Sequence, residues 1–325
     1  MAMVRERRQQ QPLRISPPLP ELHLHFPPPS LLPLVTLSNI EKLCVIGHGT
    51  DGTVYKAQDT HTHSLYALKV LRLGLDFSDD DGALHRAARE VDIQKRLDSQ
   101  YVVRCYGVLA GEDDKLAFLM EYMDGGSLED VLRARRRPLP EELIAGVARR
   151  VLEGLCYLHE NGVVHRDIKP ANLLINGDGE VKIADFGASR VVVTGDVWEP
   201  CEGTCAYMSP ERMDSEGFGG GGDGGGCPGD VWALGVVLLE CRVGRFPLVA
   251  AGEQPNWATL MCAACFGEPT PEVPEAASAE FRSFVGRCLE KDWRRRGSAR
   301  ELLSHPFVDH AHCSSPCTQS WLSID

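Results

Sequence analysis

The sequence predicts an α+β chain built as two lobes, a small strand-rich lobe followed by a larger helical one. Residues 40–122 contain short runs rich in Val, Leu and Tyr that alternate with turn segments, a pattern typical of antiparallel strands. After residue 127, most of the segments with a regular pattern are typical of helices. We interpret the segment 123–127, which contains two glycines, as the linker between the lobes.

Composition argues against several classes of function. With 325 residues, 43% hydrophobic and 25% charged, the chain has ordinary globular composition and enough length for both lobes. The net charge of −12 gives no support to nucleic-acid binding and disfavours an anionic membrane surface. The apolar run 231–239 is far shorter than the roughly 20 residues that span a bilayer. The 12 cysteines show no repeated Cys-x-x-Cys pattern and no signal peptide precedes them, so we expect reduced thiols in a cytoplasmic or nuclear protein.

The first 36 residues are predicted to be a disordered tail, because their many prolines prevent a helix or a central strand. Within this tail, Arg7 and Arg8 precede Leu13 and Ile15, which are two residues apart. An extended peptide of this kind can lay its cations on an acidic patch and its apolar side chains in a groove. The alternative is a solvated basic tail with apolar residues placed by chance.

The small lobe is expected to begin with three strands, at 42–46, 53–58 and 64–71. The turn 47–52 between the first two has the pattern Gly-x-Gly-x-x-Gly, which is weak evidence by itself. Because a strand rather than a helix follows it, the turn matches a glycine-rich flap that covers phosphate groups. Lys69 lies near the end of the third strand and is a candidate functional residue. The alternative is an ordinary exposed lysine on a strand.

A helix over residues 82–97 follows, and it carries Glu90. Taken alone, Glu90 would be a solvent-facing carboxylate. Strands at 102–109 and 116–122 complete the small lobe. The main helices expected in the second lobe cover residues 128–134, 141–161, 230–242 and 279–289.

The segment 165–172 has the most informative chemistry, because it places Asp167, Lys169 and Asn172 in one short loop. This set suits phosphoryl transfer, in which an Asp orients the attacking hydroxyl, a Lys neutralises charge on the moving phosphoryl group and an Asn holds a metal ion. The alternative for an isolated triplet of this type is a polar surface turn. A second acidic site follows, where a strand delivers Asp185 into a glycine turn.

Together these motifs make the sequence resemble the eukaryotic protein kinase catalytic domain over residues 40–308. A single motif could arise by chance, whereas the full set occurs here in the family's order. The resemblance implies a five-stranded small lobe with one main helix (40–122), a larger helical lobe (127–308), ATP in the cleft and a C-terminal tail (309–325). The motifs that carry it are the glycine flap, Lys69, Glu90, His165 to Asn172, Asp185 to Gly187, Ser209 to Glu211, Asp230 and Arg296.

The resemblance also assigns catalytic roles. Lys69, held by Glu90, would contact the α- and β-phosphates, while Asp185 and Asn172 would bind Mg²⁺. Asp167 would accept or orient the proton of the substrate hydroxyl, and Lys169 would stabilise the transferring phosphoryl group.

The implied nucleotide site combines the flap with the linker strand. Met120 would stand at the back of the adenine pocket, and Arg296 with Glu211 would form a structural ion pair. The residues expected to bind the nucleotide are Ile46, Gly47, His48, Gly49, Thr50, Asp51, Gly52, Thr53, Val54, Lys69, Glu121 and Met123.

Within the family, the segments 203–212 and 121–128 are most similar to the mitogen-activated protein kinase kinases, especially those of plants. The tail with Arg7, Arg8, Leu13 and Ile15 is similar to that group's docking peptide for a mitogen-activated protein kinase. The resemblance therefore implies a dual-specificity enzyme that phosphorylates both Thr and Tyr in the activation loop of that downstream kinase, within a signalling cascade.

The activation loop departs from the group's pattern. Plant members usually carry two Ser or Thr residues separated by five residues, as targets of an upstream kinase. Here Thr194 can fill the first place, but Pro200 stands at the second. One hypothesis is that Asp196, Glu199 and Glu202 partly substitute for phosphate. The rival is a poorly ordered loop, which would leave a weakly active or inactive kinase-shaped scaffold.

A second departure is the glycine-rich run 217–226. A run of this composition has no packed conformation to prefer, so it is expected to be a flexible surface insertion before a helix that begins near Asp230.

Overall fold

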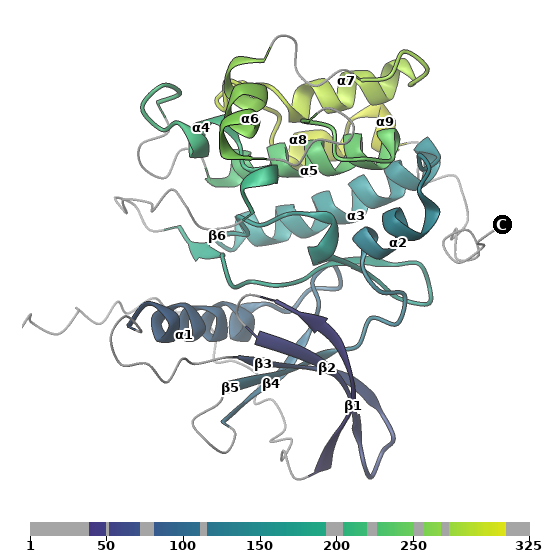
Figure 1. Ribbon diagram of the computed structural model, residues 1–325, viewed down its shortest axis with the longest axis vertical. Helices are drawn as coiled ribbons and strands as arrows, with labels where there is room; N and C mark the ends of the chain where they lie inside the picture. The colour runs from purple at the N-terminus through teal and green to yellow at the C-terminus, as the bar shows by residue number, and fades with distance from the viewer. Residues whose placement is uncertain are drawn as a thin grey trace, which may run out of the picture. The chain divides into compact units, whose positions relative to one another are not determined.

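The strand-rich lobe contains a five-stranded antiparallel sheet with the strand order β1-β2-β3-β5-β4. In Figure 1 this sheet and the helix α1 form one part of the chain, and the remaining helices form the other. The structure, a computed structural model, describes residues 39–49, 52–71, 81–110, 116–192, 204–219, 226–249, 256–267 and 273–309. The strands are β1 (Ile40–His48), β2 (Gly52–Asp59), β3 (Leu65–Leu71), β4 (Cys105–Ala110) and β5 (Leu116–Glu121).

The strands lie where the sequence predicted them, with one difference at β4. This strand begins at Cys105 instead of residue 102. Val102 instead forms an isolated bridge with Ile183 of the helical lobe, and the backbone N–H of Val103 donates to the Ile183 carbonyl at 2.9 Å. The predicted strand is therefore shorter because its first residues connect the two lobes.

Helix α1 (Asp81–Arg96) matches the predicted helix closely. It packs on the sheet through Ala87, which shares an apolar cluster with Leu71, Cys105 and Phe118. The basic residues of its last turn lie at the negative end of the helix dipole, which stabilises that turn. Helix α1 is thus fixed to the sheet by a small apolar contact.

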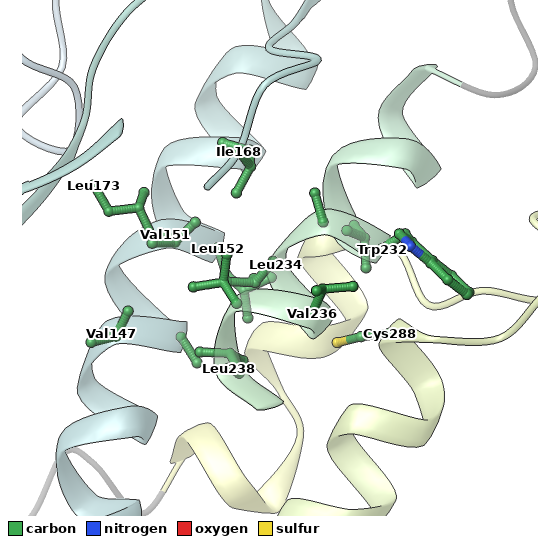
Figure 2. Packing of buried hydrophobic residues seen from close by; sticks show 14 of the residues in the cluster. Val147, Val151, Leu152, Ile168, Leu173, Trp232, Leu234, Val236, Leu238 and Cys288 are labelled. Carbon is green, nitrogen blue, oxygen red and sulfur yellow. The ribbon is translucent and has the colours of Figure 1, made fainter. Parts of the chain in front are cut away.

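The helical lobe is organised around α3 (Glu141–Glu160) and α5 (Gly226–Val243). Figure 2 shows Leu152 of α3 pointing toward Leu234 of α5, and both belong to the core cluster of this lobe. Residues 229–239 of α5 are all buried, so this helix is covered on every side. The other helices are α2 (Leu128–Arg135), α4 (Pro210–Met213), α6 (Trp257–Met261), α7 (Ala279–Cys288), α8 (Ala299–Leu303) and α9 (Pro306–Asp309), with the short helical turns η3 (Pro170–Asn172), η4 (Cys205–Tyr207) and η6 (Cys262–Phe266).

The predicted start of α5 was wrong by one turn. The helix begins at Gly226 rather than near Asp230, and it includes the end of the glycine run. A proline is compatible with the first turn of a helix, and the Pro228 carbonyl accepts a hydrogen bond from Arg296 Nη1 at 2.8 Å. Residues 215–219 form a turn, whereas 220–225 lie outside the described residues, so the flexible insertion remains a prediction. Among the helices of the described ranges, none is both long and apolar enough to cross a bilayer.

Candidate active site

Two short strand pairs bring the predicted catalytic segments together. Strand β7 (Leu173–Ile175) pairs with β8 (Val181–Ile183), and β6 (Val163–Val164) pairs with β9 (Arg190–Val191). The loop with Asp167 joins β6 to β7, and the loop with Asp185 joins β8 to β9. Because the strands are paired antiparallel, both loops emerge on the same side and line one cavity.

Both loops contain backbone in an unfavourable conformation. The φ angles of Arg166 and Asp185 are 69° and 64°, in the left-handed region that residues with a side chain rarely adopt. Such conformations cost about 1–3 kcal/mol each and persist where surrounding contacts enforce them. For Arg166 the enforcing group is Asp230 of α5, which is 1% exposed and accepts the backbone N–H groups of His165 at 2.9 Å and Arg166 at 2.7 Å.

The Asp230 carboxylate is itself paired with an imidazole. His159 Nε2, at the end of α3, lies 2.9 Å from Asp230 Oδ2. Burial alone would lower the pKa of His159, but Asp230 and the neighbouring Cys227 raise it to about 9. His159 also helps to hold the pKa of Asp230 below its usual range, against the opposing effect of burial. At neutral pH the loop is therefore anchored by a buried ion pair.

Lys69 of β3 lies between two carboxylates. Its Nζ is 2.6 Å from Glu90 Oε1 on α1 and 2.7 Å from Asp185 Oδ1. Burial alone would lower the pKa of Lys69, but the charges of Asp185 and Glu90 raise it well above its usual value. The contact with Glu90 that the resemblance implied is present, and Asp185 provides a second one.

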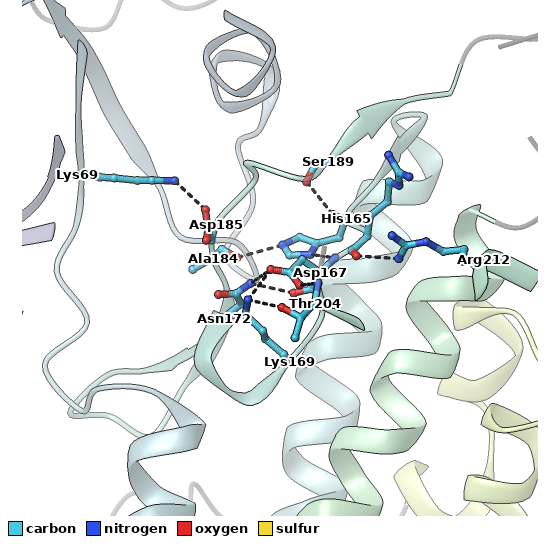
Figure 3. Close-up of polar contacts among 11 residues, drawn as sticks. Lys69, His165, Asp167, Lys169, Asn172, Ala184, Asp185, Ser189, Thr204 and Arg212 are labelled. Atoms are coloured by element: carbon cyan, nitrogen blue, oxygen red, sulfur yellow. Dashed lines mark hydrogen bonds and ion pairs between the residues drawn. The ribbon is translucent and has the colours of Figure 1, made fainter. Parts of the chain in front are cut away.

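A second network surrounds Asp167, as Figure 3 shows. Lys169 Nζ lies 2.7 Å from Asp167 Oδ2 and donates to the Thr204 hydroxyl at 2.7 Å. The Thr204 backbone N–H donates to Asp167 Oδ1 at 2.8 Å, and Asn172 Nδ2 donates to the Asp167 carbonyl at 2.8 Å. Burial alone would raise the pKa of Asp167, but Lys169 and Thr204 hold it below its usual range. Asp167 is therefore a fixed, ionised hydrogen-bond acceptor.

A cavity of about 870 Å³ lies above these networks, within the usual size range for small-molecule sites. Gly52 shows why the flap needs glycine, because a Cβ there would meet the Val70 carbonyl oxygen at 2.2 Å. Met120 also lines the cavity. The predicted nucleotide-binding residues that line it are Ile46, Gly47, His48, Gly49, Gly52, Val54, Lys69, Glu121 and Met123.

The remaining predicted members of the nucleotide site are Thr50, Asp51 and Thr53. Thr53 is buried beside the cavity instead of lining it, and its hydroxyl lies 3.4 Å from His48 Nδ1. Thr50 and Asp51 lie outside the described residues.

The donor atoms suit a hard divalent cation. Asn172 donates through Nδ2 to Asp167, which leaves its carbonyl oxygen as a possible ligand. The Asp185 side chain is 42% exposed, so its carboxylate is accessible from the cavity. An amide oxygen and a carboxylate, completed by substrate phosphates and water, form a typical Mg²⁺ environment.

Comparison with known proteins decides the family. A family model described as "Protein kinase domain" matches residues 40–308. The chain belongs to the protein kinase family. It is 50% identical to mitogen-activated protein kinase kinase 10 of Arabidopsis thaliana over 95% of this chain and 99% of the relative. Mitogen-activated protein kinase kinase 7 of the same plant is 46% identical with the same coverage, and the tobacco (Nicotiana tabacum) relative SIPKK is 38% identical over 84% of this chain and 74% of its own.

The chain is thus a protein kinase of the mitogen-activated protein kinase kinase family, as the sequence motifs predicted. Its match extends over nearly the whole length of the first two relatives. The alternative of an inactive scaffold is not favoured, since these relatives are named as kinases.

The ion pair implied for this kinase at the base of the activation segment is confirmed. Arg296 donates from Nη1 to Glu211 Oε1 at 2.7 Å and from Nη2 to Oε2 at 2.9 Å. Both side chains are 0% exposed, and the guanidinium lies over the Trp232 ring at 5.2 Å. This bidentate pair fixes α4 against the helical lobe.

Sequence reasoning missed several residues of the kinase site. Thr204 and His159 carried no local signal, because their partners are distant in the sequence. The docking residues Arg7, Arg8, Leu13 and Ile15 lie outside the described residues, as do Thr194, Asp196, Glu199, Pro200 and Glu202.

Proposed function

We propose that this kinase transfers the γ-phosphoryl group of ATP to both the Thr and the Tyr of the activation loop of a mitogen-activated protein kinase. The observation that carries the proposal is the polar network around Asp167, combined with a Lys69 that is held by Glu90 next to Asp185. The names of its relatives support the choice of substrate.

In this proposal Asp167 receives or orients the proton of the attacking hydroxyl. Its depressed pKa keeps it ionised, and the Thr204 N–H and Lys169 hold its two oxygens in place. Lys169 lies within hydrogen-bond distance of both Asp167 and Thr204, so its charge is positioned where the transferred group would pass.

The nucleotide would occupy the cavity between the flap and Lys69. Lys69 would bind the α- and β-phosphates, the flap backbone would cover them, and Glu121 and Met123 would meet the adenine. Asp185 and Asn172 would hold Mg²⁺, which supplies positive charge that offsets the charge developing between the β- and γ-phosphates.

The remaining assignments extend beyond the described residues. We propose that residues 1–36 form a tail that docks the downstream kinase through Arg7, Arg8, Leu13 and Ile15, and that an upstream kinase acts on Thr194. The kinase domain would span 40–308, with lobes at 40–122 and 127–308, followed by a C-terminal tail at 309–325. The cysteines of the described part are free thiols, which supports a cytoplasmic or nuclear location.

The test is incubation of the purified protein with ATP, Mg²⁺ and a catalytically inactive mitogen-activated protein kinase. Wild type is compared with Lys69→Met and Asp167→Ala. Phosphate incorporation is expected to fall by about two to four orders of magnitude in the variants, because positioned acid–base and electrostatic groups contribute factors of this size. Equal phosphorylation by all three proteins would show that the catalytic assignment is wrong.

A further inference from the structure

The buried residues along α1 and directly after its end are Ala87, Glu90, Ile93, Gln94 and Leu97, with 5%, 3%, 0%, 4% and 9% exposure. Their spacing, mostly of three and four residues, places them in a stripe along one face of the helix. Ala87 packs into a cluster of the small lobe, and Leu97 packs into the core of the helical lobe. Ile93 also belongs to the core of the helical lobe, so the stripe joins the two apolar clusters, and Glu90 and Gln94 are its two polar members.

The two polar positions differ in their partners. Glu90 has Lys69 at 2.6 Å. Gln94 lies one turn further along the helix and lines the same cavity, but its side-chain Oε1 is buried and accepts no hydrogen bond from any residue in the described ranges. This buried oxygen without a donor therefore lies on the face of the helix where an apolar side chain is expected.

A buried amide oxygen without a donor makes the arrangement that buries it less favourable. Leaving such a group unpaired typically shifts an equilibrium by roughly 5- to 150-fold. Turning or displacing α1 would return Gln94 to water. Glu90 is on the same helix, so the same movement would separate Glu90 from Lys69.

We propose that Gln94 is a positioning residue that weakens the packing of α1 against the two apolar clusters. It thereby limits the fraction of molecules in which Glu90 holds Lys69. An apolar side chain at this position would favour the packed position of α1. The catalytic consequence rests on the proposed function, whereas the effect on α1 does not.

The decisive variant is Gln94→Met, which removes the polar oxygen while keeping an unbranched chain of similar length and helix propensity. The matched control is Lys95→Met on the exposed side of the same helix. Hydrogen exchange of the α1 backbone amides reports helix opening, and kcat at saturating ATP reports the competent fraction. We expect Gln94→Met to slow exchange in α1 by at least about fivefold and to raise kcat by a similar factor, with Lys95→Met close to wild type.

Each outcome has a defined meaning. Unchanged exchange in α1 would overturn the proposal, as expected if a water molecule in the cavity satisfies Oε1. Slower exchange with unchanged kcat would also overturn it, because Gln94 would then affect stability without positioning Glu90. If neither wild type nor variant phosphorylates a mitogen-activated protein kinase, the proposed function fails, while α1 exchange still decides whether Gln94 loosens the helix.

Discussion

The buried ion pair between His159 and Asp230 should make the stability of this kinase depend on pH in a specific window. The informative change is His159→Gln, which removes the titrating ring but keeps a neutral N–H donor able to face Asp230. Wild-type His159 has a pKa of about 9 in the folded protein, against an ordinary value of 6.5. The comparison therefore isolates the positive charge from the hydrogen bond.

The sign and size of the effect follow from this difference. Because the folded-state pKa is raised, the stabilisation is fully present below pH 6.5 and is lost as the pH rises through about 9. The full difference corresponds to about 3 kcal/mol in the free energy of unfolding. Between these two pH values, wild type should lose about 1.4 kcal/mol per pH unit relative to the variant.

The assay is urea-induced unfolding followed by tryptophan fluorescence, at pH values from 6 to 10. The buried Trp232 on α5 provides a probe close to Asp230. The stability advantage of wild type over His159→Gln should be largest at pH 6 and nearly absent at pH 10. Cys227→Ser is the control for the neighbouring thiol. A constant difference across this range would refute the ion-pair interpretation.

Three further predictions concern the activation segment. Thr204→Val removes the hydroxyl partner of Lys169 but keeps the backbone contact with Asp167, so kcat should fall about tenfold with little change in unfolding temperature. Glu211→Gln leaves the buried charge of Arg296 without its counterpart and should reduce the free energy of unfolding by about 3–5 kcal/mol in a urea titration. If Glu199 and Glu202 act as phosphate substitutes, the unphosphorylated Glu199→Ala, Glu202→Ala double variant should lose activity; unchanged activity would reject that hypothesis.

The elements predictable from sequence were those set by local pattern. Short apolar runs separated by turns predicted the strands of the small lobe to within a few residues. Most neighbouring strands of this sheet are also consecutive in the sequence, so local pattern was sufficient. The start of α5 was missed because glycine and proline near Cys227 argue locally against a helix. Packing of α5 against α3 and α7, together with the hydrogen bond from Arg296 to the Pro228 carbonyl, outweighs that local preference.

In the candidate site, too, the residues predicted were those whose partners are close in sequence, and the residues missed were mostly those whose partners are distant. The loop with Asp167 and Lys169 could be recognised because its chemistry lies within a few residues. Thr204 is 35 positions from Lys169, and His159 is 71 positions from Asp230, so no periodicity links them. Gln94 was missed for another reason, since a glutamine on a charged helix gives no sign that it faces inward.

The most direct test of the proposed activity is mass spectrometry of a catalytically inactive mitogen-activated protein kinase after incubation with this protein, ATP and Mg²⁺. The proposed mechanism predicts phosphate on both the Thr and the Tyr of the activation loop, with wild type but not with Asp167→Asn. Absence of phosphate from both residues, or equal labelling by Asp167→Asn, would contradict it.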